Sequence, residues 1–349
     1  MFGKKKSVAG LDIGSSSVKM VELGGNLNNL NLVSLGFENL PADTIIDGQI
    51  MELNVVSDVI QNVCTNHQVS AERVVTGVSG HSVILKNIVL PSMNRDELEE
   101  SIDWHAEEHI PYDLADVSLD YQVTAETPDS TMVMIAACKR ERIDNIKQAI
   151  QLAGKTPVVI DVDTFALQNC YEVNYRPSEN DVVTLLNIGA STMSVHIVKG
   201  TRSLFTRDIT VGGSQFTDVL QRSLGLNFQQ AEAVKRGVVD AASGIEEKSI
   251  EPLMNNVTEI VAMEIQKTFD FYRATTEDNE TVVQKILISG GGSKLVGLAQ
   301  ELSQRLELPV EILDPFRNIK VDSKKFDPEY LSEIVPEMAV AVGLAIRGV

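Results

Sequence analysis

Two short stretches of this chain are similar to one another, and this duplication constrains the fold more than any other feature of the sequence. The first stretch covers residues 10–23 (GLDIGSSSVKMVEL) and the second covers residues 184–198 (TLLNIGASTMSVHIV). Each begins as an apolar run, turns at a glycine, passes three small residues and enters a second, alternating run. The repeat predicts two β-hairpins about one domain apart, and therefore a duplicated fold.

The tips of these hairpins consist of backbone and small hydroxyl side chains. Gly14 and Gly189 allow a ligand to approach the backbone closely, and the neighbouring amides and hydroxyls suit phosphate oxygens. One such hairpin is equally well explained as an ordinary hairpin with a serine-rich turn. Two of them predict that the two halves of the fold hold one polyphosphate from both sides.

Length and charge restrict the class of protein. A chain of 349 residues is long enough for two domains with sizeable cores. Its 30 Lys and Arg against 49 Asp and Glu give a net charge of −19, which excludes nucleic acid as a partner. The three cysteines are widely spaced and fit buried thiols in a reducing compartment rather than a disulfide frame or a zinc site. No run of 18 apolar residues occurs, so no membrane span is expected.

Strand and helix patterns predict a first half over residues 1–180. Its strands are expected at residues 8–13, 18–23, 30–38, 73–78 and 157–162, with a helix at 54–66. Residues of about 81–157 have an alternation of their own and predict an inserted α+β subdomain, with strands at 82–90, 117–125 and 132–137 and helices at 96–109 and 140–153. Asp163 is expected to cap a helix that runs to Tyr171. Asp161 is expected to be structural.

The second half is predicted over residues 181–349, after a polar, turn-rich segment at 176–180. It restarts with strands at 182–187, 194–198 and 203–211, and a later strand is expected at 285–289. A helical subdomain is expected at about 213–275, because apolar residues recur at helical spacing over 250–272. Further helices are expected at 295–306 and 336–346.

Placed on these elements, several motifs resemble the actin/Hsp70/FtsA nucleotide-binding superfamily. GLDIGSSSVK resembles its first phosphate motif, NIGAST its second, and ISGGGSKL its adenosine motif, while VGGSQFT and AEAVKR resemble the region whose Glu and Lys reach the adenosine. The motifs occur in the order of the superfamily between residues 10 and 294. The resemblance implies an α/β, actin/Hsp70-like duplicated nucleotide-binding fold. It would have two halves around a cleft and an FtsA-like α+β subdomain inserted in the first half.

The resemblance also implies a set of ATP-binding residues. The phosphates would contact Gly14, Ser15, Ser16, Ser17, Lys19, Asn187, Gly189, Ser191, Thr192 and Gly213. The adenosine would contact Glu232, Lys235, Gly290, Gly291, Gly292 and Lys294. Asp12 would hold Mg²⁺ through water, since magnesium keeps several waters and prefers one or two carboxylates plus phosphate oxygens. Taken singly, the glycine run also fits a plain strand-to-helix turn, and Glu232 with Lys235 also fits a solvated ion pair.

Asn187 departs from the superfamily, whose second phosphate motif usually begins with Asp. An asparagine can donate or accept a hydrogen bond, but it cannot act as a base, and a positioned base contributes roughly 10²–10⁴-fold to a rate. ATP binding is therefore expected to survive, and hydrolysis is expected to be slow or absent. Asp161 and Asp163 lie on the segment that links the two halves and could substitute for the missing Asp, although a helix cap and a structural role are expected for them. No catalytic residue is assigned.

Over the whole chain the sequence resembles the PilM family, the actin-like, FtsA-related proteins of type IV pilus assembly. The resemblance rests on FGKKKSVAGLDIGSSSVK, VSGHSVILKNIVLP, DELEESIDWHAEEHIPYD, VVIDVDTFALQN, RDITVGGSQFT, VEILDPFRNI and KFDPEYL. It implies a cytoplasmic ATP-binding scaffold, peripheral at the inner face of the bacterial inner membrane. The cytoplasmic N-terminal tail of the membrane protein PilN would hold it there by docking near the inserted subdomain.

Other inner-membrane pilus components and the pilus motor ATPases would be further partners, and the membrane would be reached only through partners. A second function class stays open at this point, namely a phosphotransferase or ATPase with a small-molecule substrate. Asn187 and the lack of an evident acceptor site favour the scaffold.

Overall fold

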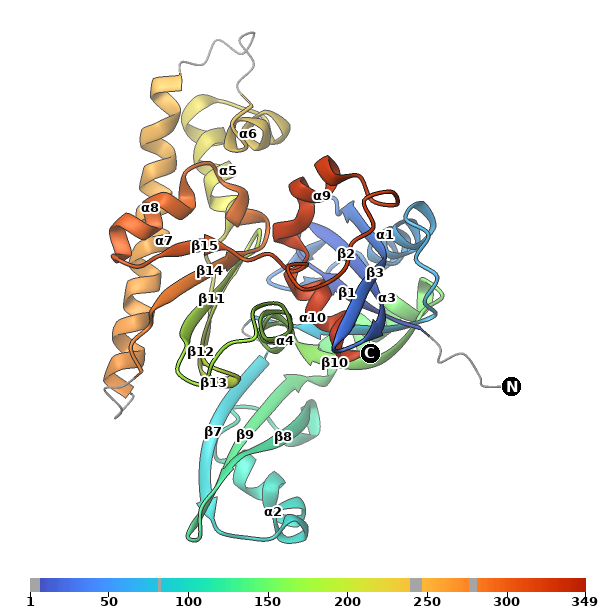
Figure 1. The fold of residues 1–349 in the computed structure, drawn as a ribbon, viewed down its shortest axis with the longest axis vertical. Coiled ribbons are helices and arrows are strands. Elements are labelled where there is room, and N and C mark those ends of the chain that lie inside the picture. Colours follow the sequence, from blue (N-terminus) through green and yellow to red (C-terminus); the bar gives the residue numbers. More distant parts are fainter. Residues whose placement is uncertain (1–6, 81–82, 239–246, 276–280) are drawn as a thin grey trace.

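The computed structural model describes residues 7–80, 83–238, 247–275 and 281–349 (Figure 1). Its first sheet has the strand order β10-β6-β1-β2-β3. These strands are β1 (Val8–Ile13), β2 (Ser17–Asn26), β3 (Asn29–Asn39), β6 (Arg73–Val78) and β10 (Thr156–Val162). The second sheet has the order β13-β12-β11-β14-β15. Its strands are β11 (Val182–Ile188), β12 (Met193–Lys199), β13 (Arg202–Ile209), β14 (Lys285–Ser289) and β15 (Val310–Ile312).

The two sheets are built on one plan. In each, the first strand pairs antiparallel with the second to form a hairpin, and it pairs parallel with the fourth strand of the set. Counted along the chain, both sheets have the order third, second, first, fourth, fifth. The duplication predicted from the two hairpin sequences is confirmed. The division into residues 1–180 and 181–349 stays a prediction.

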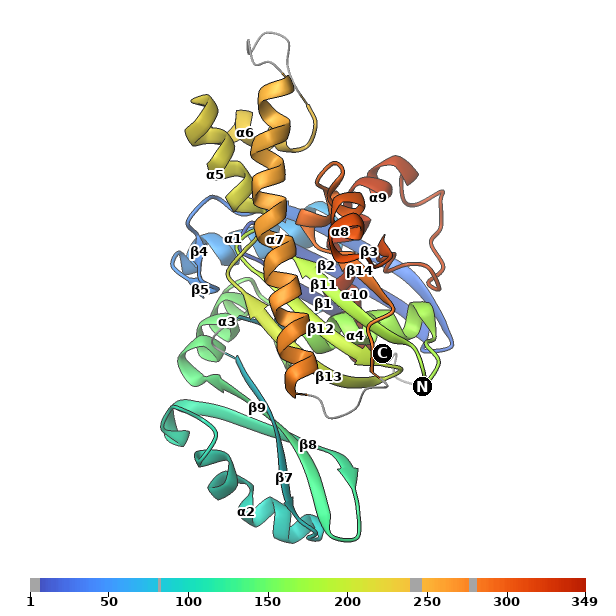
Figure 2. The same cartoon turned by 90° about the vertical axis from the view of Figure 1, so that its left-hand side faces the viewer.

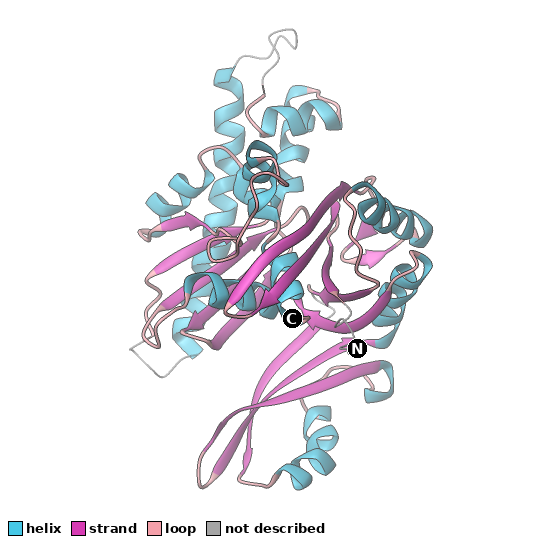
Figure 3. Cartoon of the chain, turned by 45° about the vertical axis from the view of Figure 1, so that its right-hand side comes forward, coloured by secondary structure: helices cyan, strands magenta, loops and turns pink. Residues whose placement is uncertain are grey.

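Helices cover both faces of the sheets (Figure 3). Helices α4 (Asp163–Tyr175) and α10 (Ala339–Arg347) lie between the two sheets, in a core that contains Val21 of one sheet and Leu185 of the other. The outer face of the first sheet is covered by α1 (Leu53–Asn66) and α3 (Arg140–Leu152). The outer face of the second sheet is covered by α5 (Gly213–Leu224), α7 (Glu247–Thr275) and α8 (Leu298–Leu306), with α6 (Phe228–Lys235) packed on α5 and α7.

Helices α4 and α10 approach one another so closely that only glycine fits at their crossing. A Cβ atom built on Gly343 of α10 would lie 1.7 Å from the carbonyl oxygen of Ala166 in α4. Both helices belong to the layer between the sheets. This crossing therefore fixes the first sheet against the segment that leads to the second.

A three-stranded sheet projects from the rest of the molecule (Figure 2). It has the order β7-β9-β8, with β7 (Val83–Pro91), β8 (Val117–Glu126) and β9 (Ser130–Lys139) all antiparallel. Helix α2 (Arg95–Glu107) covers one face through Leu98 and Ile102, and it begins at a capping box formed by Asn94 and Glu97. The opposite edge of β7 has no strand partner among the described residues. We call residues 83–139 the insert.

Several element boundaries differ from those predicted. The expected helix at 295–306 is a 3₁₀ turn at Gly291–Lys294 followed by α8, because Gly297 takes a left-handed conformation with φ of 78°. The expected helix at 336–346 is split into a 3₁₀ turn at Val335–Glu337 and α10. The expected strand at 82–90 begins at Val83, and Ser82 lies outside the described residues. The chain also forms β4 (Ile45–Ile46), β5 (Gln49–Ile50), a 3₁₀ turn at Leu114–Asp116 and α9 (Pro328–Ile334).

Among the described residues, no helix is long and apolar enough to cross a membrane. This agrees with the absence of a long apolar run in the sequence.

Candidate nucleotide cleft

One large cavity of about 710 Å³ lies where the two sheets meet. Such a volume is typical of a site for a small organic ligand. Every residue expected to bind ATP or magnesium lines this cavity: Asp12, Gly14, Ser15, Ser16, Ser17, Lys19, Asn187, Gly189, Ser191, Thr192, Gly213, Glu232, Lys235, Gly290, Gly291, Gly292 and Lys294. The structure thus brings together residues up to 282 positions apart in the sequence. We call this cavity the cleft.

The two hairpins meet at their tips inside the cleft. In the first hairpin the backbone N–H of Gly14 donates to the carbonyl of Ser17 at 3.0 Å, and in the second Gly189 donates to Thr192 at 2.9 Å. The Ser191 hydroxyl donates to the Ser15 hydroxyl at 2.6 Å. The serine-rich tips therefore face one another, as expected for two halves that hold one polyphosphate.

Asp12 and Lys19 lie side by side in the first hairpin. They are paired residues of β1 and β2, and the Lys19 ammonium lies 3.2 Å from the Asp12 carboxylate. Burial disfavours the charged form of Lys19, but the attraction of Asp12 and then of Glu337 outweighs it, so the pKa of Lys19 is raised. Lys19 is therefore a fixed positive charge on the floor of the cleft.

The opposite end of the cleft is formed by helices α5 and α6. Lys235 forms an ion pair with Glu232 one turn earlier on α6, and both also hydrogen-bond to the Thr217 hydroxyl of α5. Lys235 donates in addition to the carbonyl of Gly213 at 3.3 Å. Burial lowers the pKa of Lys235 despite the pairing with Glu232. The predicted pair is thus partly buried and held in place by α5, rather than fully solvated.

The glycine run after β14 closes the same end of the cleft. Gly290 has a φ of 82°, and its N–H donates to the carbonyl of Pro336 at 2.8 Å. A Cβ atom on Gly292 would lie 2.2 Å from the side chain of Ile188. Lys294, at the end of this turn, pairs with Glu337 at 2.9 Å. The run is therefore required for close packing as well as for an open wall of the cleft.

Asp163 has a different place from the one that its sequence position predicts. The residue at the N-cap of α4 is Val162, and no side chain caps this helix end, so the expectation that Asp163 caps the helix is wrong. Asp163 instead occupies the first turn and lines the cleft. Burial raises its pKa to about 7, and the nearby negative charge of Asp12 adds to this effect.

Ser79, Arg142 and Glu337 also line the cleft, and no sequence pattern pointed to them. Of the lining residues that were not predicted, Asp163 alone has a sequence position that indicates its place. Asp163 directly follows β10, which pairs parallel with β6, and β6 pairs parallel with β1. The carboxyl ends of these three strands therefore lie together, and Asp12 is near the end of β1. Ligands of open α/β sheets bind beyond the carboxyl ends of the strands.

Asp12 and Asp163 together fit a hydrated magnesium ion. The negative charge of Asp12 contributes to the raised pKa of Asp163, and a cation beside these two carboxylates would relieve that repulsion. Among the described residues, no group of three or more His, Cys, Asp or Glu side chains could hold a metal ion. Two carboxylates fit magnesium, which takes one or two of them and completes its shell with water and phosphate oxygens.

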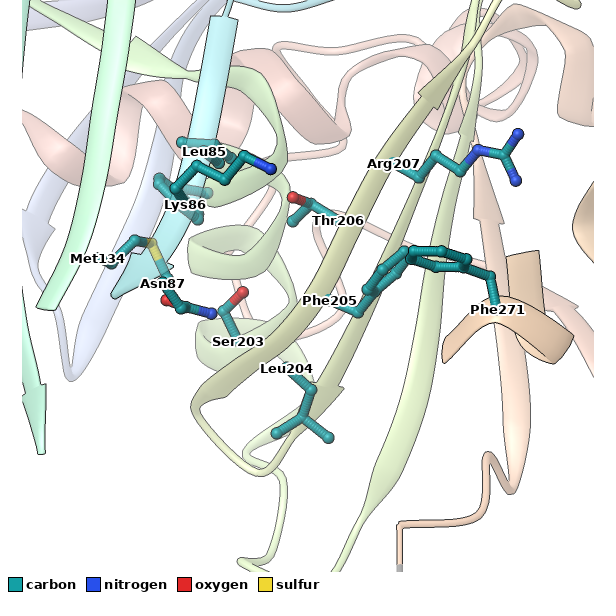
Figure 4. A pocket seen from close by; sticks show the side chains of 11 residues that line it. Leu85, Lys86, Asn87, Met134, Ser203, Leu204, Phe205, Thr206, Arg207 and Phe271 are labelled. Carbon is teal, nitrogen blue, oxygen red and sulfur yellow. The ribbon is translucent and has the colours of Figure 1, made fainter. Parts of the chain in front are cut away.

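A second cavity, of about 480 Å³, lies between the insert and the second sheet (Figure 4). Strand β7 forms one wall through Leu85, Lys86 and Asn87, with Met134 of β9 beside them. Strand β13 forms the other wall through residues 203–207, and Phe271 of α7 packs on Phe205 there. Both β7 and β13 are edge strands of their sheets. We call this cavity the β7–β13 groove.

Comparison with known proteins identifies the family. Residues 10–349 match the family described as type IV pilus assembly protein PilM. The chain belongs to the PilM family. A solved structure entitled "PilM-PilN type IV pilus biogenesis complex" is 32% identical and has a TM-score of 0.85, with 98% of each chain covered. Family membership makes this protein a component of type IV pilus assembly.

More distant structures share the fold. The ethanolamine utilization protein EutJ of Carboxydothermus hydrogenoformans is 14% identical, with a TM-score of 0.59 and coverage of 97% of this chain and 88% of that one. MreB5 of Spiroplasma citri, solved with AMPPNP, is 13% identical, with a TM-score of 0.53 and coverage of 97% and 95%. The expected fold class and the expected membership of the PilM family are both confirmed.

Proposed function

We propose that this PilM-family protein is an ATP-binding scaffold that docks to the cytoplasmic N-terminal tail of PilN. It would be cytoplasmic and peripheral at the inner face of the inner membrane, reaching the membrane only through partners. The observation that carries the proposal is the pair of cavities on one chain: a cleft between the duplicated hairpins and a groove between the edge strands β7 and β13. A small-molecule phosphotransferase is not favoured, since the whole-chain match is to a pilus assembly family.

ATP would bind with its phosphates between the two hairpin tips and its adenosine between α6 and the glycine run. Ser15 and Ser191 would exchange their mutual hydrogen bond for phosphate oxygens. Lys19 would neutralise phosphate charge, and Asp12 and Asp163 would hold magnesium through water. Bound magnesium supplies charge neutralisation at the phosphates. The solved relative with AMPPNP supports this assignment at the level of the fold.

Asp12→Ala is expected to weaken Mg-ATP binding at least about tenfold, because it removes a carboxylate that would hold magnesium. A tenfold loss corresponds to about 1.4 kcal/mol. Gly291→Leu is expected to do the same by filling the cleft, since a Cβ there has 3.4 Å to Glu337, its nearest neighbour. Calorimetry with Mg-ATP measures both effects. Asp58→Ala, at an exposed position of α1, is the matched control. Unchanged affinity in both variants would contradict the cleft assignment.

Hydrolysis is expected to be slow or absent, because Asn187 cannot act as a base. Its side-chain oxygen accepts a hydrogen bond from Ser289 at 3.3 Å, which fixes the amide on the wall of the cleft. Steady phosphate release would stay below about 1 s⁻¹, the low end of ordinary enzyme turnover. Faster release that disappears in Asp12→Ala would overturn this expectation.

The β7–β13 groove suits an extended peptide tail. Its two walls are edge strands that have no strand partner on this side among the described residues. Their backbone groups can pair with an added strand, and the apolar side chains of the groove offer pockets for alternate residues of that strand. The exposed fraction of Phe271 is 56%, which is large for a phenylalanine and leaves the ring available to a ligand. Other inner-membrane pilus components and the motor ATPases are further proposed partners.

Leu85→Asp and Phe271→Asp are each expected to weaken binding of a PilN tail peptide at least about tenfold, because each places a charge in an apolar wall that binding desolvates. Fluorescence anisotropy with a labelled peptide measures the affinity. Leu152→Asp, at an exposed apolar position of α3 outside the groove, serves as the control. Equal affinity of wild type and the three variants would show that the tail does not bind in this groove.

A further inference from the structure

Strand β13 borders both cavities. Its residues 203–207 wall the β7–β13 groove, and Thr210, just beyond its end, lines the cleft. Asp208 lies between these two sets of residues and belongs to neither lining. Any movement of β13 is therefore shared by the groove and the cleft.

The carboxylate of Asp208 contacts the segment that leads into the insert. The backbone N–H of Gly80 donates to Asp208 Oδ2 at 2.7 Å, a short charge-assisted hydrogen bond. Ser79 and Gly80 line the cleft, and the chain continues from them to β7, the other wall of the groove. This bond therefore ties the two walls of the groove together at the end nearest the cleft.

The surroundings of this hydrogen bond hold groups without a partner. Arg142 donates from Nη2 to the carbonyl of Ser79 at 2.9 Å, and its charge attracts Asp208. Yet Arg142 Nε and Asp208 Oδ1 are both buried and have no hydrogen-bond partner among the described residues. Buried hydrogen-bond donors and acceptors are nearly always satisfied. An unsatisfied donor on Arg142 and an unsatisfied acceptor on Asp208 therefore point to a second arrangement in which these groups find partners.

We propose that the Gly80–Asp208 hydrogen bond is a clasp through which Mg-ATP in the cleft sets the affinity of the groove for a peptide tail. Asp208 is its positioning residue. The inference rests on the proposed function, since it requires that the cleft takes ATP and the groove takes the tail. ATP held by both hairpins fixes one angle between the two sheets. Because the clasp joins β13 to the segment before β7, that angle also sets the distance between the two walls of the groove.

The size of the effect is limited by how differently ATP binds the two arrangements, and the coupling is reciprocal. Mg-ATP should change the affinity for the tail by the same factor as the tail changes the affinity for Mg-ATP. Couplings of this kind are typically about 5- to 150-fold. Removing the clasp should reduce the factor without removing either binding site.

The test measures the affinity of the full chain for a labelled PilN tail peptide, with and without a saturating non-hydrolysable Mg-ATP analogue. The wild-type ratio of the two affinities is expected to be about tenfold. In Asp208→Ala the ratio should fall to within about twofold of one, while the affinity for the analogue alone stays near wild type. Asp208→Asn keeps an oxygen acceptor for Gly80 and should retain most of the ratio. Arg202→Ala, an exposed position of the same strand, is the matched control.

A wild-type ratio in Asp208→Ala overturns the clasp, and so does a ratio of one in a wild-type protein that binds both ligands. A wild-type protein that binds the nucleotide but no peptide contradicts the proposed docking, and the clasp with it. Asp208→Ser, whose hydroxyl is too short to reach Gly80, replaces the alanine variant if thermal melting shows that the latter does not fold. Loss of the ratio in Asp208→Asn and Asp208→Ala alike would assign the effect to the charge and contradict the hydrogen bond.

Discussion

Gly343→Ala is expected to destabilise the protein by at least about 3 kcal/mol, the upper range for overpacking a core. The new methyl group would lie 1.7 Å from the Ala166 carbonyl, so one helix backbone must move. Alanine in a helix interior gains about 1 kcal/mol over glycine, which is too little to offset this clash. Urea unfolding followed by circular dichroism measures the change.

The control for this variant is Gly213→Ala in the first turn of α5. A Cβ atom there has 3.6 Å to its nearest neighbour, so its stability should stay within about 1 kcal/mol of wild type. Equal stability of Gly343→Ala and wild type would show that the backbones of α4 and α10 are not in contact at this crossing. The crossing would then not hold the layer between the sheets.

Acid is expected to destabilise the protein through His196. Its imidazole is fully buried in β12, where Nδ1 lies 3.0 Å from the Thr164 carbonyl and Nε2 lies 3.0 Å from the Ser203 hydroxyl. Burial lowers its pKa from 6.5 to about 4. Below pH 6.5 the unfolded chain binds a proton that the folded chain rejects, so stability falls as the pH falls from 6.5 to about 4.

The full loss from His196 is about 3 kcal/mol, from a pKa difference of about 2.5 at 1.36 kcal/mol per unit. Asp163 acts in the opposite direction, because its raised pKa makes the folded chain bind the extra proton. The comparison that isolates His196 is therefore between wild type and His196→Gln. Urea unfolding at pH 7 and pH 4.5 should show a smaller acid loss in the variant. An equal loss in both proteins would mean that His196 is protonated in the folded state.

The hairpins and the glycine run could be predicted because their signals are local. A strand, a glycine and three small residues occupy about 14 consecutive positions, and the same run occurs twice. The repeat predicted the duplication, but the order of the strands within each sheet is known only from the structure. Helix α2 likewise had a readable start, since the Asn94–Glu97 capping box lies within four residues.

The rest depends on contacts that no local pattern records. Asp163 has the residue type and place of a helix cap, but the parallel pairing of β10 with β6 turns it toward Asp12. Glu337 reaches the cleft from a segment 43 residues beyond Lys294, its partner. The groove lies between edge strands of two different sheets, and no sequence pattern in β7 or β13 predicts that these strands lie close together.

The insert has the geometry of a lever arm. Strands β7 and β9 pair along their whole length, from Val83 with Cys138 to Pro91 with Ser130, and both join the remaining chain at the Val83 end. Nine residues of strand extend about 30 Å at roughly 3.3 Å per residue. A rotation of about 10° at the base would therefore carry the far tip through about 5 Å over that length. A displacement too small to alter the core could in this way move the outer end of the insert by more than the width of one strand.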